Sequence, residues 1–122
     1  MNGKYTTYSG FEFSPDALQT ENIDIKDIAH ALSRICRFNG HIKGFYSVAQ
    51  HSIKVSDRLR ELGFNKKIQL CGLLHDAAEA YLGDIPTPIK KILSDYVSLE
   101  IQYQSAIFKH FNLLNSWEKI HL

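Results

Sequence analysis

The chain has 122 residues, of which 44% are hydrophobic and 22% charged, and its formal net charge is +1. This length and composition predict a single globular domain over residues 1–122 and exclude intrinsic disorder. No basic run or stripe indicates a long nucleic acid partner, and no apolar run approaches the roughly 18 residues of a membrane span.

The start of the chain and its cysteines bear on the cellular location. The residues after Met1 lack the apolar stretch of a signal peptide, so we expect a cytoplasmic protein without a membrane partner. Cys36 and Cys71 lie among apolar residues and lack the spacing of metal ligands. We interpret both as buried thiols.

Residues 1–23 carry four aromatic residues at partly alternating spacing. Turn signals at Ser9-Gly10 and at Ser14-Pro15 interrupt them, so the segment is predicted to form a short hairpin or an extended arm. We expect its aromatic side chains to cover one end of a helical core. These residues are Tyr5, Tyr8, Phe11 and Phe13.

A first helix is predicted over residues 25–36, because apolar residues recur there at helical spacing. Asn22 or Asp24 supplies the N-cap, and Asp27 places a carboxylate in the first turn, where the helix dipole favours negative charge. His30 lies beside the apolar face and is better interpreted as a satisfied core histidine than as a metal ligand. The apolar face consists of Ile25, Ile28, Ala29, Leu32 and Ile35.

Residues 37–45 contain two glycines and an Asn-Gly turn signal, which predict a loop. The guanidinium of Arg37 beside the ring of Phe38 suits a phosphate clamp that also stacks on, or selects by shape, a sugar or a base. A solvated arginine and a packing phenylalanine are the alternative. His41 either donates a hydrogen bond to phosphate or to a leaving oxygen, or has no role in a site.

Two further helices are predicted over residues 46–62 and 65–82, ended by Gly63 and Gly83. The first of them carries His51, and Asn65 caps the second. The apolar positions of the first are Val48, Ile53, Val55, Leu59 and Leu62, and those of the second are Ile68, Leu70, Cys71, Leu73 and Leu74.

His75 and Asp76 are neighbours in the predicted helix over residues 65–82, in otherwise apolar surroundings. Ionisable groups are costly there unless something binds them, and a divalent metal ion is the natural partner. Adjacent helix positions differ by about 100°, so both side chains can reach one ion at the edge of a cleft. Glu79 shares roughly the face of Asp76 and is placed to act on a water at that ion. A capped, solvated helix face is the alternative for the His-Asp pair.

Asp84 begins a turn over residues 84–88 that two prolines make rigid. Beside a metal cleft, its carboxylate is placed to hold a sugar hydroxyl or to order the attacking water. An N-cap for the following helix is the alternative, and the two roles are compatible.

Two more helices are predicted to complete the bundle. Thr87 caps or Pro88 begins a short fourth helix, in which Lys90 and Lys91 form a basic edge that is better interpreted as a solvated face than as a phosphate site. A fifth helix is predicted over residues 95–112. Its inward residues are expected to be Val97, Ile101, Ala106, Ile107, Phe108 and Phe111.

Taken together, three motifs resemble the HD superfamily of metal-dependent phosphohydrolases, especially the small bacterial 5'-deoxynucleotidases and phage deoxynucleotide triphosphohydrolases. The resemblance covers residues 27–101 and implies an all-α fold, a compact bundle of about five helices with the N-terminal arm or hairpin. The motifs are Gln50-His51-Ser52, His75-Asp76-x-x-Glu79 and Gly83-Asp84-Ile85-Pro86-Thr87-Pro88.

The resemblance implies a hydrolase that cleaves phosphate from a small-molecule nucleotide, with a deoxynucleotide as the expected substrate. It implies a divalent ion, Mn²⁺, Co²⁺, Fe²⁺, Ni²⁺ or Mg²⁺, as the cofactor, and it is consistent with a homodimer. The implied metal ligands are His51, His75 and Asp76, the catalytic residues Glu79 and Asp84, and the substrate-binding residues Arg37 and Phe38. His41 is added as a candidate substrate-binding residue because of its place in the same loop, not because of the resemblance.

The sequence departs from the family pattern in two places. Arg37-Phe38 stands where the family has Arg followed usually by Trp, so an indole donor is lost and the sugar preference stays open. The fourth metal ligand of the family is an aspartate on a later helix, and no aspartate follows Asp95 here. Residues 117–122 are similar to the approach to that helix, so we expect a domain without it. A truncated chain, a site completed by water and an acid from a partner chain are the alternatives.

Two other classes of function stay open, the first of them because of the missing aspartate. One is a non-catalytic nucleotide-binding or regulatory HD domain, which would hold a nucleotide without turnover. The other is a structural interaction module with an incidental metal, which would show neither nucleotide binding nor a metal-dependent thermal shift.

Overall fold

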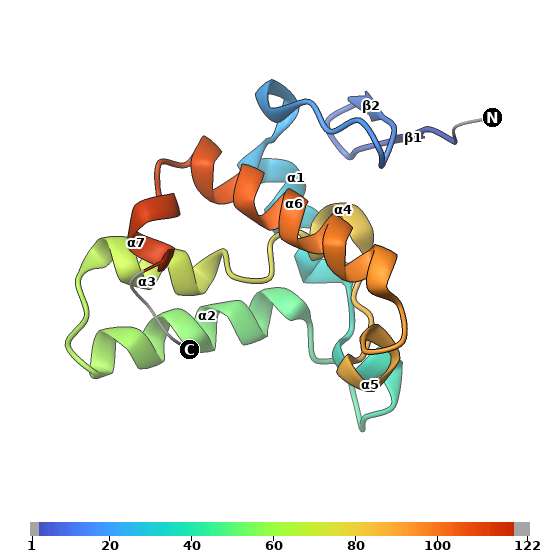
Figure 1. The fold of residues 1–122 in the computed structure, drawn as a ribbon. Coiled ribbons are helices and arrows are strands. Elements are labelled where there is room, and N and C mark those ends of the chain that lie inside the picture. Colours follow the sequence, from blue (N-terminus) through green and yellow to red (C-terminus); the bar gives the residue numbers. More distant parts are fainter. Residues whose placement is uncertain (1–2, 119–122) are drawn as a thin grey trace.

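The computed structural model describes residues 3–118, which form an all-α bundle with a small N-terminal hairpin (Figure 1). None of the helices within residues 3–118 has the length and apolar character needed to cross a bilayer. The expectation for residues 117–122 falls largely outside the described residues. The elements are β1 (Tyr5–Thr6), β2 (Glu12–Phe13), the 3₁₀ helices Thr20–Asn22 and Arg37–Gly40, α1 (Ile25–Arg34), α2 (Val48–Glu61), α3 (Lys66–Leu73), α4 (Glu79–Leu82), α5 (Thr87–Lys90), α6 (Ser94–His110) and α7 (Leu114–Glu118).

The predicted N-terminal hairpin is confirmed, because β1 and β2 pair antiparallel with Tyr5 opposite Phe13. The Phe13 ring is buried and lies 5.6 Å edge-on from the ring of Tyr81, which follows the expectation that the arm covers the core. Tyr103 on α6 fastens the arm, because its hydroxyl donates to the Pro15 carbonyl at 2.8 Å. The other three aromatic residues of the arm, Tyr5, Tyr8 and Phe11, are exposed instead, and Tyr8 stacks on His30 at 3.7 Å.

Buried side chains from the hairpin and from α1, α2, α3 and α6 form a continuous hydrophobic core. Tyr103 and Ile107 of α6 are fully buried in it. Of the two cysteines, Cys71 is buried as predicted, whereas Cys36 is only half-buried. The packing of α2 against α3, side by side in Figure 1, depends on Gly72, where any side chain would meet Leu59.

The helix starts follow the local capping signals. The Asp24 carboxylate accepts from the Lys26 amide at the start of α1, and the Asn65 side chain caps α3. Ser47 and Gln50 form a reciprocal capping box at the start of α2, which therefore begins two residues later than predicted. Helix α1 ends at Arg34 rather than at residue 36.

Several positions predicted to face the core are exposed. Helical spacing predicts a broad apolar stripe, but each helix buries only the part of that stripe that meets a neighbour, and the first and last turns project past the core. These positions are Ile25, Ala29, Ile53, Leu62, Leu70 and Ile101.

The continuous helix predicted over residues 65–82 is wrong. Helix α3 ends at Leu73. Backbone hydrogen bonds between residues three positions apart follow, including one from the Ala77 N–H to the Leu74 carbonyl at 3.0 Å. Helix α4 then starts at Glu79 and ends at Gly83, which has a φ of +85°. His75 and Asp76 therefore lie on a turn between two helices, not on one helical face.

The end of the bundle also differs from the prediction. The Thr87 side chain does not cap α5, which starts directly after Pro86. Helix α6 spans Ser94–His110, close to the predicted residues 95–112. The break after α3 and the short α7 raise the number of α-helices within residues 3–118 from the expected five or so to seven.

Candidate metal centre

Three side chains from two parts of the bundle converge at the turn between α3 and α4. His51 comes from the first turn of α2, and His75 and Asp76 come from the turn itself. One ligand atom from each lies within 4.8 Å of the other two. Asp76 Oδ2 lies 3.0 Å from His75 Nε2 and 3.5 Å from His51 Nε2. This is a His/Asp group able to hold a metal ion.

The hydrogen bond of His75 fixes which of its nitrogens faces the group. Nδ1 lies 2.6 Å from the Gly72 carbonyl oxygen, which only accepts, so Nδ1 carries a hydrogen. A metal-binding histidine is held in this way, with its other nitrogen bonded to a carbonyl or carboxylate. Nε2 then faces the Asp76 carboxylate at 3.0 Å, and only a cation or a proton makes that approach favourable. The donor set therefore fits a divalent ion.

The histidine charges follow from their surroundings. Burial acts to lower the pKa of His75, but the hydrogen bond and the charge of Asp76 raise it overall. Burial, with the positive charge of Arg37, lowers the pKa of His51. His51 is therefore neutral at neutral pH, which is the form that binds metals.

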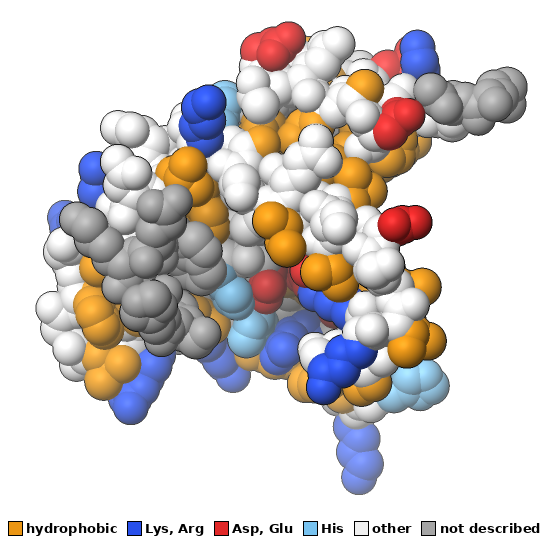
Figure 2. All heavy atoms as spheres, viewed as in Figure 1, with side chains coloured by type: hydrophobic (Ala, Val, Ile, Leu, Met, Phe, Trp, Pro, Cys, Tyr) orange, Lys and Arg blue, Asp and Glu red, His pale blue; other side chains and the backbone are white. Residues whose placement is uncertain are grey.

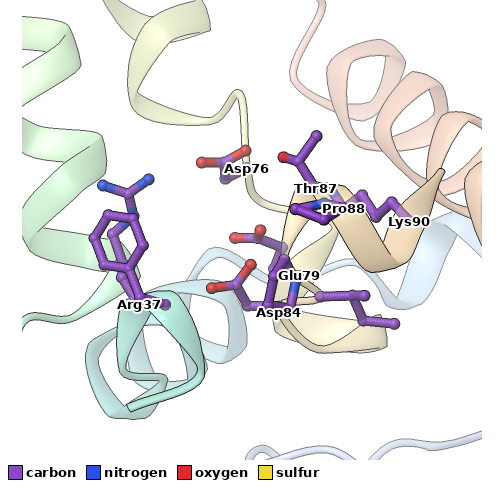
Figure 3. A pocket seen from close by; sticks show the side chains of 10 residues that line it. Arg37, Asp76, Glu79, Asp84, Thr87, Pro88 and Lys90 are labelled. Atoms are coloured by element: carbon purple, nitrogen blue, oxygen red, sulfur yellow. The ribbon is translucent and has the colours of Figure 1, made fainter. Parts of the chain in front are cut away.

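A cleft of about 280 Å³ opens beside this group. Figure 3 shows Arg37 on one side of it and Lys90 on the other, with the carboxylates of Asp76, Glu79 and Asp84 between them. In Figure 2, acidic, basic and histidine side chains gather in the hollow between α6 and α2. Residues 85–88, which include the connection after α4 and the first residues of α5, supply the remaining wall.

Glu79 is the most perturbed carboxyl of the cleft. Its side chain is buried, and its Oε2 has no hydrogen-bond partner among the described residues. Burial, followed by the negative charges of Asp76 and Asp84, raises the pKa of Glu79 to about 9. A cation at the His/Asp group would act in the opposite direction and favour the carboxylate.

Arg37 and Phe38 enter the cleft from a constrained loop. The Arg37 guanidinium lies 4.7 Å from the centre of the Phe38 ring and 5.9 Å from that of Tyr46. Phe38 has a φ of +59°, an unfavourable conformation for a bulky residue, and its ring is half exposed. Backbone strain of this kind concentrates at functional loops, and Phe38 is not packed in the core.

The structure does not bring His41 into the cleft. Its side chain is exposed and lies outside the set of residues that line the cavity. His30 is likewise separate from the ligand group, because it stacks on Tyr8 and accepts a hydrogen bond from Arg34 Nε at 2.9 Å.

The chain is similar to two uncharacterized bacterial proteins. It is 43% identical over 108 residues to YfdR of Escherichia coli strain K12, an alignment that covers 88% of this chain and 57% of YfdR. It is 39% identical over 97 residues to a protein of Rhodobacter capsulatus, covering 75% of this chain and 50% of that protein. YfdR is a relative. The chain spans about half the length of these curated relatives, and no family model matches it.

Sequence reasoning gave no site role to two residues that the structure places at the site. Lys90, interpreted as part of a solvated face, lines the cleft and pairs with Glu100 of α6 at 2.8 Å. Gln104 of α6 bonds to both ends of the turn that carries His75 and Asp76. The Gln104 contacts join residues 26 and 30 positions apart and have no local signal, whereas Lys90 pairs with a residue ten positions away.

Proposed function

We propose that the protein is a metal-dependent phosphohydrolase of the HD superfamily that cleaves phosphate from a nucleotide, with a deoxynucleotide as the first candidate substrate. The observation that supports it is the convergence of His51, His75 and Asp76 beside a cleft that presents both a guanidinium and a buried carboxyl. Metal-dependent hydrolysis of a phosphate ester needs a metal site, a cation for the phosphoryl group and a carboxyl group in one place.

His51, His75 and Asp76 would hold the ion. Two nitrogens and one carboxylate favour Mn²⁺, Co²⁺, Fe²⁺ or Ni²⁺ over Mg²⁺. When bound, such an ion supplies Lewis-acid polarisation of a phosphoryl oxygen and lowers the pKa of water.

The remaining cleft residues act directly on substrate and water. Glu79, as the carboxylate, takes a proton from the attacking water. Arg37 binds the phosphoryl oxygens and stabilises the charge that develops on them. Asp84 orders the same water or holds a sugar hydroxyl. Phe38 offers an exposed ring against the sugar or base.

Measuring phosphate release would test this proposal. The substrates are nucleoside and deoxynucleoside mono- and triphosphates, each tested with several divalent metals. Glu79→Ala should abolish turnover while the purified protein keeps its metal. His75→Ala should lose the metal itself, measured by elemental analysis. Turnover at the normal rate by Glu79→Ala would contradict the base assignment.

A non-catalytic nucleotide-binding domain is the second candidate. It is favoured by the ligand group, which contains three protein ligands within residues 3–118, one fewer than the resemblance implies. A nucleotide that binds in the cleft, weakens on Arg37→Ala and is released unchanged with every metal would support this function instead.

A further inference from the structure

The side chain of Gln104 joins α6 to both ends of the turn that carries His75 and Asp76. Its Oε1 accepts from the Ala78 backbone N–H at 3.1 Å. Its Nε2 donates to the Leu74 carbonyl at 2.7 Å. One carboxamide from a distant helix therefore brackets the two adjacent metal ligands.

The backbone needs this contact because the helix is broken there. Leu74 is the C-cap of α3, and Ala78 is the N-cap of α4, which has no side-chain cap of its own. Carbonyls at a helix end and amides at a helix start lack partners within the helix. Ala78 is buried, where an unpaired amide is costly. Gln104 supplies the partner of the Ala78 amide and a second donor to the Leu74 carbonyl, which also accepts from the Ala77 N–H.

We propose that Gln104 is a positioning residue for the metal centre. By holding Leu74 and Ala78 at a fixed separation, it directs His75 Nε2 and Asp76 Oδ2 toward His51. This inference rests on the proposed function, because it assigns Gln104 a role in the same site. Gln104 acts through the turn rather than through the substrate, since both ends of its carboxamide are engaged.

The bond between His75 Nδ1 and Gly72 does not replace this role. It joins two residues of the same segment, three positions apart, and so orients the imidazole only relative to its own turn. Gln104 instead fixes the position of the turn relative to α6. This helix also carries Glu100, the partner of Lys90. The ligand turn and the wall of the cleft thus share one supporting helix.

The test compares Gln104→Met with Gln102→Met. Both substitutions lie on α6 and remove a glutamine carboxamide, but the side chain of Gln102 is exposed. Co²⁺ is titrated into the full chain and followed by its visible absorption. Gln104→Met should weaken Co²⁺ binding by about 10–100-fold, the usual effect of removing a residue that supports a metal ligand, and should alter the absorption bands. Gln102→Met should match the wild type.

Hydrogen exchange in the metal-free protein gives a second readout. Gln104→Met should speed exchange of the Ala78 amide while core amides such as that of Ile107 keep their protection. Gln104→Leu, an apolar residue of similar size, is the second variant should the methionine variant fail to fold.

Unchanged Co²⁺ affinity and absorption in Gln104→Met would overturn the positioning role, even with a lower Tm, because a merely structural contact predicts that pattern. Failure of the wild type to bind Co²⁺ would instead overturn the proposed metal function, and the metal role of Gln104 with it. The two failures are therefore distinguishable.

Discussion

Glu79 has a carboxyl whose pKa, near 9, lies far above its ordinary value of 4.5. Because the folded protein holds the proton more tightly than the unfolded chain does, the stability linked to Glu79 is present below about pH 4.5 and is lost as the pH rises toward 9. At neutral pH the metal-free fold therefore carries a buried acid in its neutral form.

Glu79→Gln should remove this pH dependence, because a glutamine is neutral throughout the range. In the presence of a chelator, the variant should melt above the wild type at pH 8 by about 3 °C or more, which corresponds to roughly 1 kcal/mol in a domain of this size. At pH 4.5 the difference should be smaller. Thermal denaturation by circular dichroism checks this.

Glu61→Gln is the matched control, since Glu61 is an exposed carboxyl at the end of α2. The Tm of Glu61→Gln should differ from that of the wild type by the same amount at every pH. A Tm difference for Glu79→Gln that is also constant with pH would show that the buried carboxyl is not held neutral.

The candidate site was predictable from the sequence only in part. His51, His75 and Asp76 were identified because their types and spacing form a motif, and they do lie together. His41 is predicted as a substrate residue because an imidazole in the loop of Arg37 can donate to phosphate, yet sequence proximity does not fix direction, and its side chain lies outside the cleft. Gln104 carries no signal, since its partners are 26 and 30 residues away.

At the level of elements, local chemistry predicted where helices begin better than where they continue. Asp24 and Asn65 cap helices as expected, because capping depends on neighbouring residues. The helix predicted over residues 65–82 breaks after Leu73, although Ala77 and Ala78 continue the apolar pattern. Tertiary hydrogen bonds from α6 replace the helical ones there, and periodicity does not report tertiary partners.

The close approach of α2 and α3 should make Gly72→Ala destabilising. Alanine favours a helix over glycine by about 1 kcal/mol, but the added methyl group would meet the buried side chain of Leu59. Overpacking of this kind costs about 1–3 kcal/mol, so the net effect should be a loss of stability. Urea unfolding measures it.

A double-mutant cycle separates the two effects. In a Leu59→Ala background the contact with Leu59 is gone, although an added Cβ still meets Val55 Cγ1 at 3.2 Å, so Gly72→Ala should cost clearly less stability than in the wild type. An equal loss of stability in both backgrounds would show that the contact between the two helices does not require glycine.

For the whole molecule, an ion at the candidate centre would join α2 to the turn between α3 and α4. A ligand that binds only the folded state stabilises it, by about 2.7 kcal/mol at a concentration 100 times its Kd. Addition of Co²⁺ should therefore raise the Tm of the metal-free protein, and a chelator should reverse the rise.

Two histidine variants make the thermal shift specific. His51→Ala should abolish it, because His51 is the candidate ligand from α2. His30→Ala should retain it, because His30 stacks on Tyr8 away from the ligand group. Equal shifts in both variants would place the ion elsewhere.

The hydrogen bond between the Tyr103 hydroxyl and the Pro15 carbonyl joins residues 88 positions apart, whereas His51 and His75 are separated by a single helical hairpin. Short loops close at a lower entropic cost and earlier in folding than long ones. The ligands should thus assemble before the arm docks on α6. Stopped-flow refolding with Co²⁺ would then show the cobalt absorption ahead of the tyrosine fluorescence change, and the reverse order would refute this sequence of events.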